Sequence, residues 1–304
     1  MESTGIQKRH SIAADTGVGA IHLRVTDGKR SAQFYTAVLG LEVLGREGAL
    51  IRLGASGREL VVLDPGARGP VREQTTGLYH FAIVVPSRGE LALVIKRLAE
   101  HRYPQSPTDH VMTKANYLSD PDGNGIEIYV ETPEDGTFSM SKDKFSAIDR
   151  NGVERSGRDP IDVRELFSHL DEGASLAQPM GPGTKMGHIH LHVRDIDEAV
   201  YFWSDQVGFD VMGRSQRFGA AFVSAGGYHH HLGLNTWQGV GAPPPSQGLA
   251  GMQFFTIELP SQTDLEVVAA RLRVGAITLE QEGPEGFFIQ DPSRNRARLA
   301  VAKG

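Results

Sequence analysis

Hydrophobic and polar residues alternate in short runs along most of this chain, and the first such run is followed by a helical pattern. Residues 21–25 read Ile-His-Leu-Arg-Val, so their apolar side chains share one face of a predicted strand. Residues 28–38 then carry apolar positions at helical spacing, and Gly40 is placed to end that helix. Three short alternating runs follow. This stretch therefore predicts a βαβββ module.

The same pattern recurs, which makes internal repetition the main feature of the sequence. Residues 21–27 (Ile-His-Leu-Arg-Val-Thr-Asp) match residues 189–195 (Ile-His-Leu-His-Val-Arg-Asp), and residues 77–86 match residues 251–260 more loosely. Self-similarity at this scale indicates duplicated structural units. The predicted fold is α+β, with four modules at residues 18–65, 77–133, 186–237 and 250–302.

The modules fall into two segments of the chain. Residues 18–133 form the predicted N-terminal segment, and residues 186–302 form the C-terminal one. Between them, residues 134–185 are rich in Gly, Pro, Ser and charge, which is typical of a linker.

Composition narrows the class of protein. The 304 residues are 39% hydrophobic and 22% charged, which is typical of a globular protein with two domains. The net charge of −6, without a basic block, argues against nucleic-acid binding. Cysteine is absent, which excludes disulfides and thiolate metal sites. No apolar run suits a signal peptide or a membrane span, so we expect a cytoplasmic protein, and a homo-oligomer is compatible with the sequence.

One carboxylate stands out as candidate chemistry. Residues 120–125 read Asp-Pro-Asp-Gly-Asn-Gly, a predicted turn, and the strand that follows carries Glu127 and Tyr129 on one face. A carboxylate on a buried strand face needs a cation or a hydrogen-bond donor. The chain has 12 histidines, which are candidate partners.

Four βαβββ modules resemble the vicinal oxygen chelate superfamily, which includes glyoxalases, bleomycin-resistance proteins and type I extradiol dioxygenases. The resemblance covers nearly the whole chain apart from its N-terminus and the linker. It implies that modules pair into curved sheets, and that such a cup holds a divalent metal. The metal ligands would come from the first and last strands of the paired modules.

The resemblance assigns the ligand positions residue by residue. The second and third modules keep metal-binding side chains there, namely His80, Glu127 and His188. The other two modules have lost theirs and carry Ala20, Phe254 and Arg298 instead. A complete site therefore requires the second module to pair with the third, and the first with the fourth. Two imidazoles and one carboxylate form the facial triad suited to non-heme Fe(II), with Mn(II) as the second choice.

A second motif resembles the signature of type I extradiol dioxygenases, close to the catechol 2,3-dioxygenase branch. It runs from His110 through Tyr117 and Asp120-Pro121 to Glu127, and only Asn116 departs from the usual apolar residue. The resemblance implies that a catechol and O2 meet at the metal. It also implies that His110 and Tyr117 donate hydrogen bonds to the substrate oxygens.

Three consecutive histidines, at residues 229–231, are candidates for proton transfer. If the last strand of the third module runs through them, His229 and His231 face the cup and His230 faces away. We expect His231 to act as the acid–base residue and His229 to line the pocket. His231 could instead be a fourth metal ligand.

The predicted function is an extradiol dioxygenase that cleaves a catechol-type ring with O2. Two alternatives use the same scaffold: a glyoxalase-like isomerase or lyase, and a dioxygenase that cleaves a hydroquinone ring. A sequestering protein without catalysis is a further alternative, and the His110–Tyr117 signature argues against it. The substituents on the substrate ring are not encoded in any motif found in the sequence.

Overall fold

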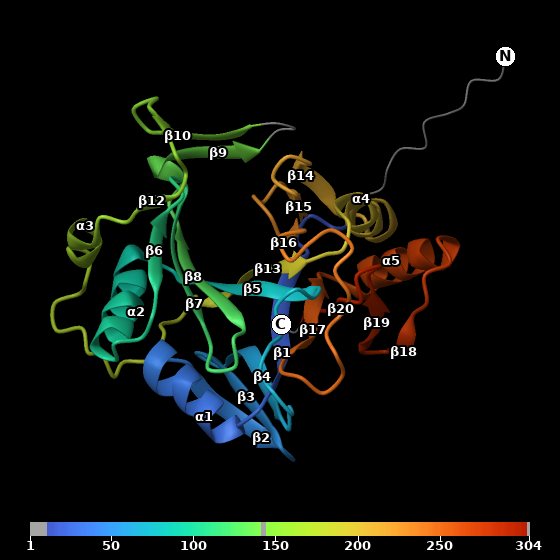
Figure 1. Cartoon of the computed structure of the whole chain (residues 1–304), viewed down its shortest axis with the longest axis horizontal. Coiled ribbons are helices and arrows are strands. Elements are labelled where there is room, and N and C mark those ends of the chain that lie inside the picture. The colour runs from blue at the N-terminus through green and yellow to red at the C-terminus, as the bar shows by residue number, and fades with distance from the viewer. Residues whose placement is uncertain (1–10, 141–143, 303–304) are drawn as a thin grey trace.

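The computed structural model describes residues 11–140 and 144–302. Two large curved sheets and the helices that cover them make up most of the molecule (Figure 1). Within the described ranges, no helix combines the length and the apolar character needed to cross a bilayer.

The first large sheet joins the first and fourth modules. Its eight strands are, in order, β18 (Glu280–Gly283), β19 (Gly286–Gln290), β20 (Arg296–Val301), β17 (Gly251–Leu259), β1 (Gly17–Val25), β4 (Arg58–Pro65), β3 (Leu50–Ala55) and β2 (Glu42–Glu47). The modules meet where β1 runs antiparallel to β17. This is the pairing expected from the distribution of candidate ligands.

The second large sheet joins the second and third modules. Its nine strands are, in order, β12 (Asp159–Pro160), β6 (Ser106–Asp109), β7 (Thr113–Ser119), β8 (Gly125–Glu131), β5 (Gly77–Val84), β13 (Lys185–His192), β16 (Leu232–Asn235), β15 (Ala220–Ser224) and β14 (Asp210–Ser215). Antiparallel pairing of β5 with β13 closes the junction. The two sheets approach each other near the middle of the molecule, where β1 contacts β13 (Figure 1).

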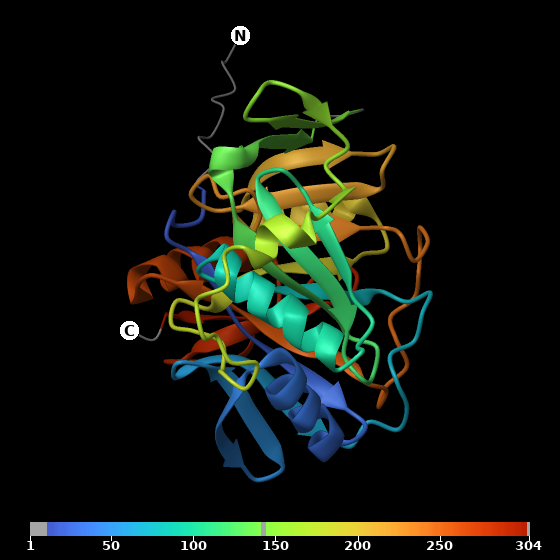
Figure 2. The same cartoon turned by 90° about the vertical axis from the view of Figure 1, so that its left-hand side faces the viewer.

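Each module carries its helix after its first strand, as the periodicity predicted. The helices are α1 (Gly28–Gln33), α2 (Arg88–Glu100), α4 (Ile196–Val200) and α5 (Gln262–Val274), and α1 and α4 continue as wider π-helical turns over Phe34–Leu39 and Tyr201–Val207. A side-chain oxygen caps each start; Ser87, for example, accepts a hydrogen bond from the Glu90 amide. Gly40 ends the first helix at φ 95°, as expected of a left-handed C-cap. Figure 2 shows α2 lying against β7 and β8.

The segment between the two halves of the chain is itself folded. It contains a single turn at Pro133–Asp135, the strands β9 (Gly136–Met140), β10 (Phe145–Asp149) and β11 (Glu154–Arg155), and the helix α3 (Val163–Phe167). Strands β9 to β11 form a separate sheet, which contacts the third module: the ring centroids of Phe145 and Phe218 are 4.4 Å apart. The linker therefore packs on both halves of the second large sheet, because β12 also pairs with β6.

Candidate metal centre and active site

Three side chains converge inside the cup of the second sheet. His80 comes from β5, Glu127 from β8 and His188 from β13, and all three are buried. The His80 Nε2 atom lies 3.0 Å from Glu127 Oε2 and 3.3 Å from His188 Nε2. The His188 Nε2 atom lies 3.1 Å from the same carboxylate oxygen. The candidate ligands from two modules thus form one compact triangle.

The size of this triangle fits a metal ion with three ligands on one face. Donor atoms about 2.1 Å from a metal and at right angles to each other lie about 3.0 Å apart. Burial alone would raise the pKa of Glu127, but His188 and His80 outweigh it and hold that pKa well below its ordinary value. Burial lowers the pKa of His188. An anionic carboxylate and a neutral imidazole are the protonation states that metal binding requires.

The position of Glu127 follows from the turn before it. The Asp120 carboxylate accepts hydrogen bonds from the backbone amides of Asp122 and Asn124, each at 2.9 Å. Gly125 then passes close to β5, where an added Cβ would lie 1.9 Å from the Tyr79 carbonyl oxygen. Glycine at this point lets β8 pair with β5, which brings Glu127 level with Ala82, the residue that also pairs with His188.

The His110 and Tyr117 side chains meet at the edge of this group. His110 Nε2 lies 2.9 Å from the Tyr117 hydroxyl, and Tyr117 pairs with Glu127 across β7 and β8. Burial, reinforced by the negative charge of Glu127, raises the pKa of Tyr117 well above its ordinary value. Tyr117 therefore keeps its proton and stays a hydrogen-bond donor.

The three consecutive histidines are arranged differently from the expectation. His230, which was expected to face away, lies against His188 with ring centroids 4.1 Å apart, so that prediction is wrong. The nitrogens of His188, His229 and His230 lie within 4.8 Å of one another. The physical reason is that β16 begins only at Leu232, so the alternation of a strand does not extend back to residues 229–231.

His231 is held outside both groups of candidate ligands found in the described part of the chain. Its Nδ1 atom accepts a hydrogen bond from the Ala225 amide at 3.2 Å and lies 2.9 Å from Ser224 Oγ. Its ring lies beside Tyr228 and Phe209. No observation tests its expected acid–base role, but His229 and His230 lie closer to the triangle.

Other polar residues of the cup were not identified from the sequence. The Tyr228 hydroxyl lies 2.5 Å from both the Tyr129 hydroxyl and Glu131 Oε1. His229 Nδ1 lies 3.6 Å from the same Glu131 oxygen. Tyr129 shares the strand face of Glu127, which was the available signal, whereas Tyr228 lies in an irregular segment that periodicity cannot orient.

The equivalent positions of the first sheet hold no such triangle. Arg298 pairs with Thr256 in β17 just as Glu127 pairs with Ala82 in β5, so the two positions correspond. The Phe254 ring stacks on His22 at 4.0 Å between centroids. Arg298 points to Glu285, with one nitrogen 3.3 Å from the carboxylate. An aromatic stack and a guanidinium thus stand where the second sheet has its candidate ligands.

Comparisons with known proteins show the family of the chain. The model of the Glyoxalase/Bleomycin resistance protein/Dioxygenase superfamily matches residues 17–128 and 185–299. A catechol-2,3-dioxygenase of Bacillus subtilis is 38% identical over 285 residues, which are 93% of this chain and 96% of that protein. A biphenyl-2,3-diol 1,2-dioxygenase 3 of Rhodococcus globerulus is 31% identical over 122 residues, which are 38% of this chain and 64% of that protein.

Solved structures support the fold. A putative dioxygenase from Bacillus subtilis has a TM-score of 0.65 at 14% identity, covering 97% of this chain and 87% of that one. Glyoxalase I from Zea mays has a TM-score of 0.54 at 16% identity, covering 94% and 92%. At these identities the likeness concerns the fold alone.

Proposed function

The chain belongs to the Glyoxalase/Bleomycin resistance protein/Dioxygenase superfamily and to the family of the Bacillus subtilis catechol-2,3-dioxygenase, and from this we propose that it is an extradiol dioxygenase that cleaves a catechol ring with O2. One observation carries the proposal: the triangle of His80, Glu127 and His188 shares a cup with the His110–Tyr117 pair. The triangle alone suits several metal-dependent reactions. The His110–Tyr117 pair favours ring cleavage among them, because it belongs to the motif that resembles the extradiol dioxygenase signature.

We propose that His80, His188 and Glu127 hold Fe(II), with Mn(II) as the second choice. Two neutral imidazoles and a carboxylate on one face leave coordination positions open for small molecules. A bound metal would supply Lewis acidity and a common template for the catechol and O2. The low pKa of Glu127 supports this role, because it keeps the single negative charge in place.

The remaining residues of the cup would handle protons and orientation. His230 is now the stronger candidate for the acid–base residue, because its ring lies 4.1 Å from that of His188. Burial holds the pKa of His230 well below its ordinary value, so its imidazole is neutral and has one ring nitrogen without a proton. Tyr117 and His110 would contact the substrate oxygens as a hydrogen-bonded pair, in which His110 Nε2 lies 2.9 Å from the Tyr117 hydroxyl.

The substrate has room for a substituent on its ring. A cavity of about 1030 Å³ opens beside His80 and Tyr117 and continues between the loops at residues 71–77 and 245–251. Pockets for drug-sized ligands have volumes of about 300–1,000 Å³. This cavity is therefore larger than a single catechol ring requires, and we expect substituted catechols to be accepted.

Anaerobic reconstitution with Fe(II), followed by a panel of alkyl- and aryl-substituted catechols and air, tests the proposal. We expect O2 uptake together with a yellow ring-fission product, and neither in Glu127→Gln prepared in parallel. No colour and no O2 uptake across catechols and hydroquinones would refute ring cleavage. Cleavage of hydroquinones alone would identify the alternative dioxygenase.

The glyoxalase-like alternative usually needs a fourth protein ligand, and one observation bears on it. His229 and His230 lie close enough to His188 to join a metal site. The same preparation should therefore be assayed without O2 on the hemithioacetal of methylglyoxal and glutathione. Turnover there, without ring cleavage, would replace the dioxygenase proposal.

A further inference from the structure

The turn that carries His110 is strained. Val111 has a φ of 71°, in the left-handed region that β-branched residues rarely adopt. Two backbone hydrogen bonds of 2.9 Å close this turn, from the His110 amide to the Thr113 carbonyl and from the Met112 amide to the His110 carbonyl. Strain of this kind persists only where the surroundings hold it, and it is common at functional sites.

Three side chains hold Val111 in this conformation. Asp109 Oδ1 accepts a hydrogen bond from the Val111 amide at 2.7 Å. Lys114 Nζ and Thr132 Oγ1 both donate to the Val111 carbonyl oxygen, each at 2.9 Å. Both backbone polar groups of Val111, its amide and its carbonyl, are thus hydrogen-bonded to side chains.

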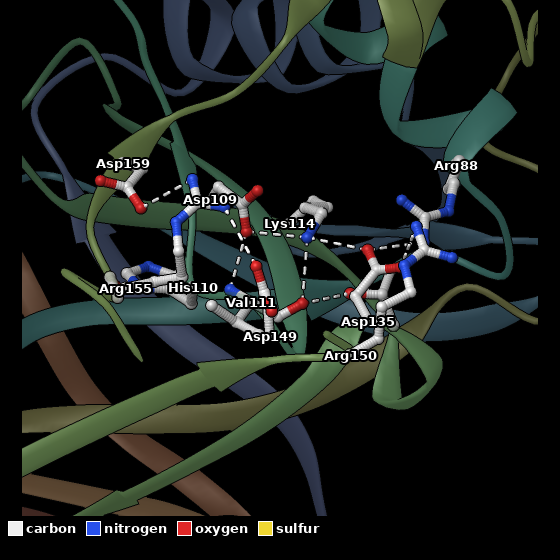
Figure 3. Close-up of polar contacts among 12 residues, drawn as sticks. Arg88, Asp109, His110, Val111, Lys114, Asp135, Asp149, Arg150, Arg155 and Asp159 are labelled. Atoms are coloured by element: carbon white, nitrogen blue, oxygen red, sulfur yellow. Dashed lines mark hydrogen bonds and ion pairs between the residues drawn. The ribbon is translucent and has the colours of Figure 1, made fainter. Parts of the chain in front are cut away.

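Lys114 is the centre of this clamp. Its side chain is only 9% exposed, and its ammonium group lies 2.7 Å from Asp109 and 2.9 Å from Asp135 (Figure 3). Arg88, on α2, lies 2.8 Å from the same oxygen, Asp135 Oδ2, and Arg150 lies 3.4 Å from Oδ1. The charges balance around a buried ammonium, so Lys114 stays fixed although it reaches neither the triangle nor Tyr117.

The linker holds His110 from the other side. His110 Nδ1 lies 2.6 Å from the Gly157 carbonyl oxygen, and a carbonyl only accepts, so Nδ1 carries the proton. In neutral imidazole the Nε2 atom is then the acceptor that faces the Tyr117 hydroxyl. The linker stays next to the turn because Asp159 pairs with Asp109 between β12 and β6.

We propose that Lys114 and the Gly157 carbonyl are positioning elements that fix the place and the tautomer of His110 against Tyr117. The role in catalysis rests on the proposed function, because it assigns His110 and Tyr117 to the substrate. The linker is then part of the active site, and Lys114 acts on the reaction only through the turn. The strain at Val111 is the reason that a clamp is needed.

Lys114→Met tests the clamp, and Val111→Gly tests the reason for it. We expect Lys114→Met to lower kcat by about 10- to 100-fold, the effect of a small misplacement, with KM and bound metal little changed. Adding Val111→Gly should restore kcat, since glycine adopts this φ without strain, but should not restore the melting temperature. Arg88→Met is the matched control: it removes one of the cations that pair with Asp135 without touching the turn, so it should lower stability and leave kcat nearly unchanged.

The double variant separates positioning from general stability. A double variant as slow as Lys114→Met, or an equal loss of kcat in Arg88→Met, would overturn the proposal. Nitrogen chemical shifts of the His110 ring give a second readout that needs no turnover. We expect the Nδ1–H tautomer in the wild type and the double variant and a mixture in Lys114→Met; unchanged shifts in Lys114→Met would also overturn it. If no catechol is cleaved, the proposed function fails while these shifts still test the clamp.

Discussion

Replacing Glu127 with glutamine removes the only negative charge of the triangle and keeps the size of the side chain. In the wild type, a metal ion at 100 times its Kd adds about 2.7 kcal/mol to the free energy of unfolding. A chain of 304 residues has an unfolding entropy of about 0.6 kcal/mol/K, so the melting temperature should rise by about 4 °C. Changes even to the groups that support metal ligands weaken binding by about 10- to 100-fold. If Glu127→Gln binds the metal 100-fold more weakly, the same metal concentration raises the melting temperature of the variant by less than about 1 °C.

Thermal unfolding under anaerobic conditions, with and without Fe(II), measures both shifts, and calorimetric titration gives the affinities. Glu131→Gln is the matched control, because Glu131 lies on the same face of β8 but hydrogen-bonds Tyr228 instead of the triangle. We expect it to keep the full wild-type shift. A full shift in Glu127→Gln, or its loss in Glu131→Gln, would contradict the assignment of Glu127 as the anionic ligand.

Three further predictions concern the cup and the sheets. His230→Ala should lower kcat by about 10²- to 10⁴-fold with metal retained, and His231→Ala by far less, measured by O2 uptake and metal analysis; the reverse order would restore His231 as the acid–base residue. Burial lowers the pKa of His22 from 6.5 to about 4, so the unfolded chain takes up this proton first and stability falls as pH drops from 6.5 toward 4. In His22→Phe, the free energy of unfolding should fall by up to about 3 kcal/mol less over this pH range, measured by urea unfolding at pH 7 and pH 4.5. Asp122→Ala should lower the free energy of unfolding by about 2 kcal/mol and with it the urea midpoint. The reason is that the buried Asp122 carboxylate accepts a hydrogen bond from the Thr26 amide at 2.9 Å and pairs with Arg30.

The parts of the fold that could be predicted from the sequence were those that repeat. The match between residues 21–27 and 189–195 aligned the modules, and the alignment showed which positions had lost their ligands. The pairing of modules followed, because His80 and His188 share a cup only if β5 meets β13. Helix ends were also predictable, since Gly40 has a local physical reason to end a helix.

The parts that could not be predicted depend on irregular backbone. His230 was assigned the wrong face because a period of two has meaning only inside a strand, and β16 starts two residues later. The strain at Val111 leaves no mark in a pattern of apolar and polar residues. The linker has no repeat partner, so nothing in the sequence aligned β9 to β11 with a known position.

The residues of the candidate site come from both sides of the linker in the sequence. Glu127 precedes residues 134–185 and His188 follows them, so neither half of the chain contains the triangle. Pairing of β5 with β13 brings the three side chains together, and in the same arrangement the linker lies beside β6 and the third module. Gly157 reaches His110 in this arrangement. The triangle and the placement of His110 therefore depend on the same pairing of the two halves of the chain. On the proposed function, this couples metal binding to the placement of the residues assigned to the substrate.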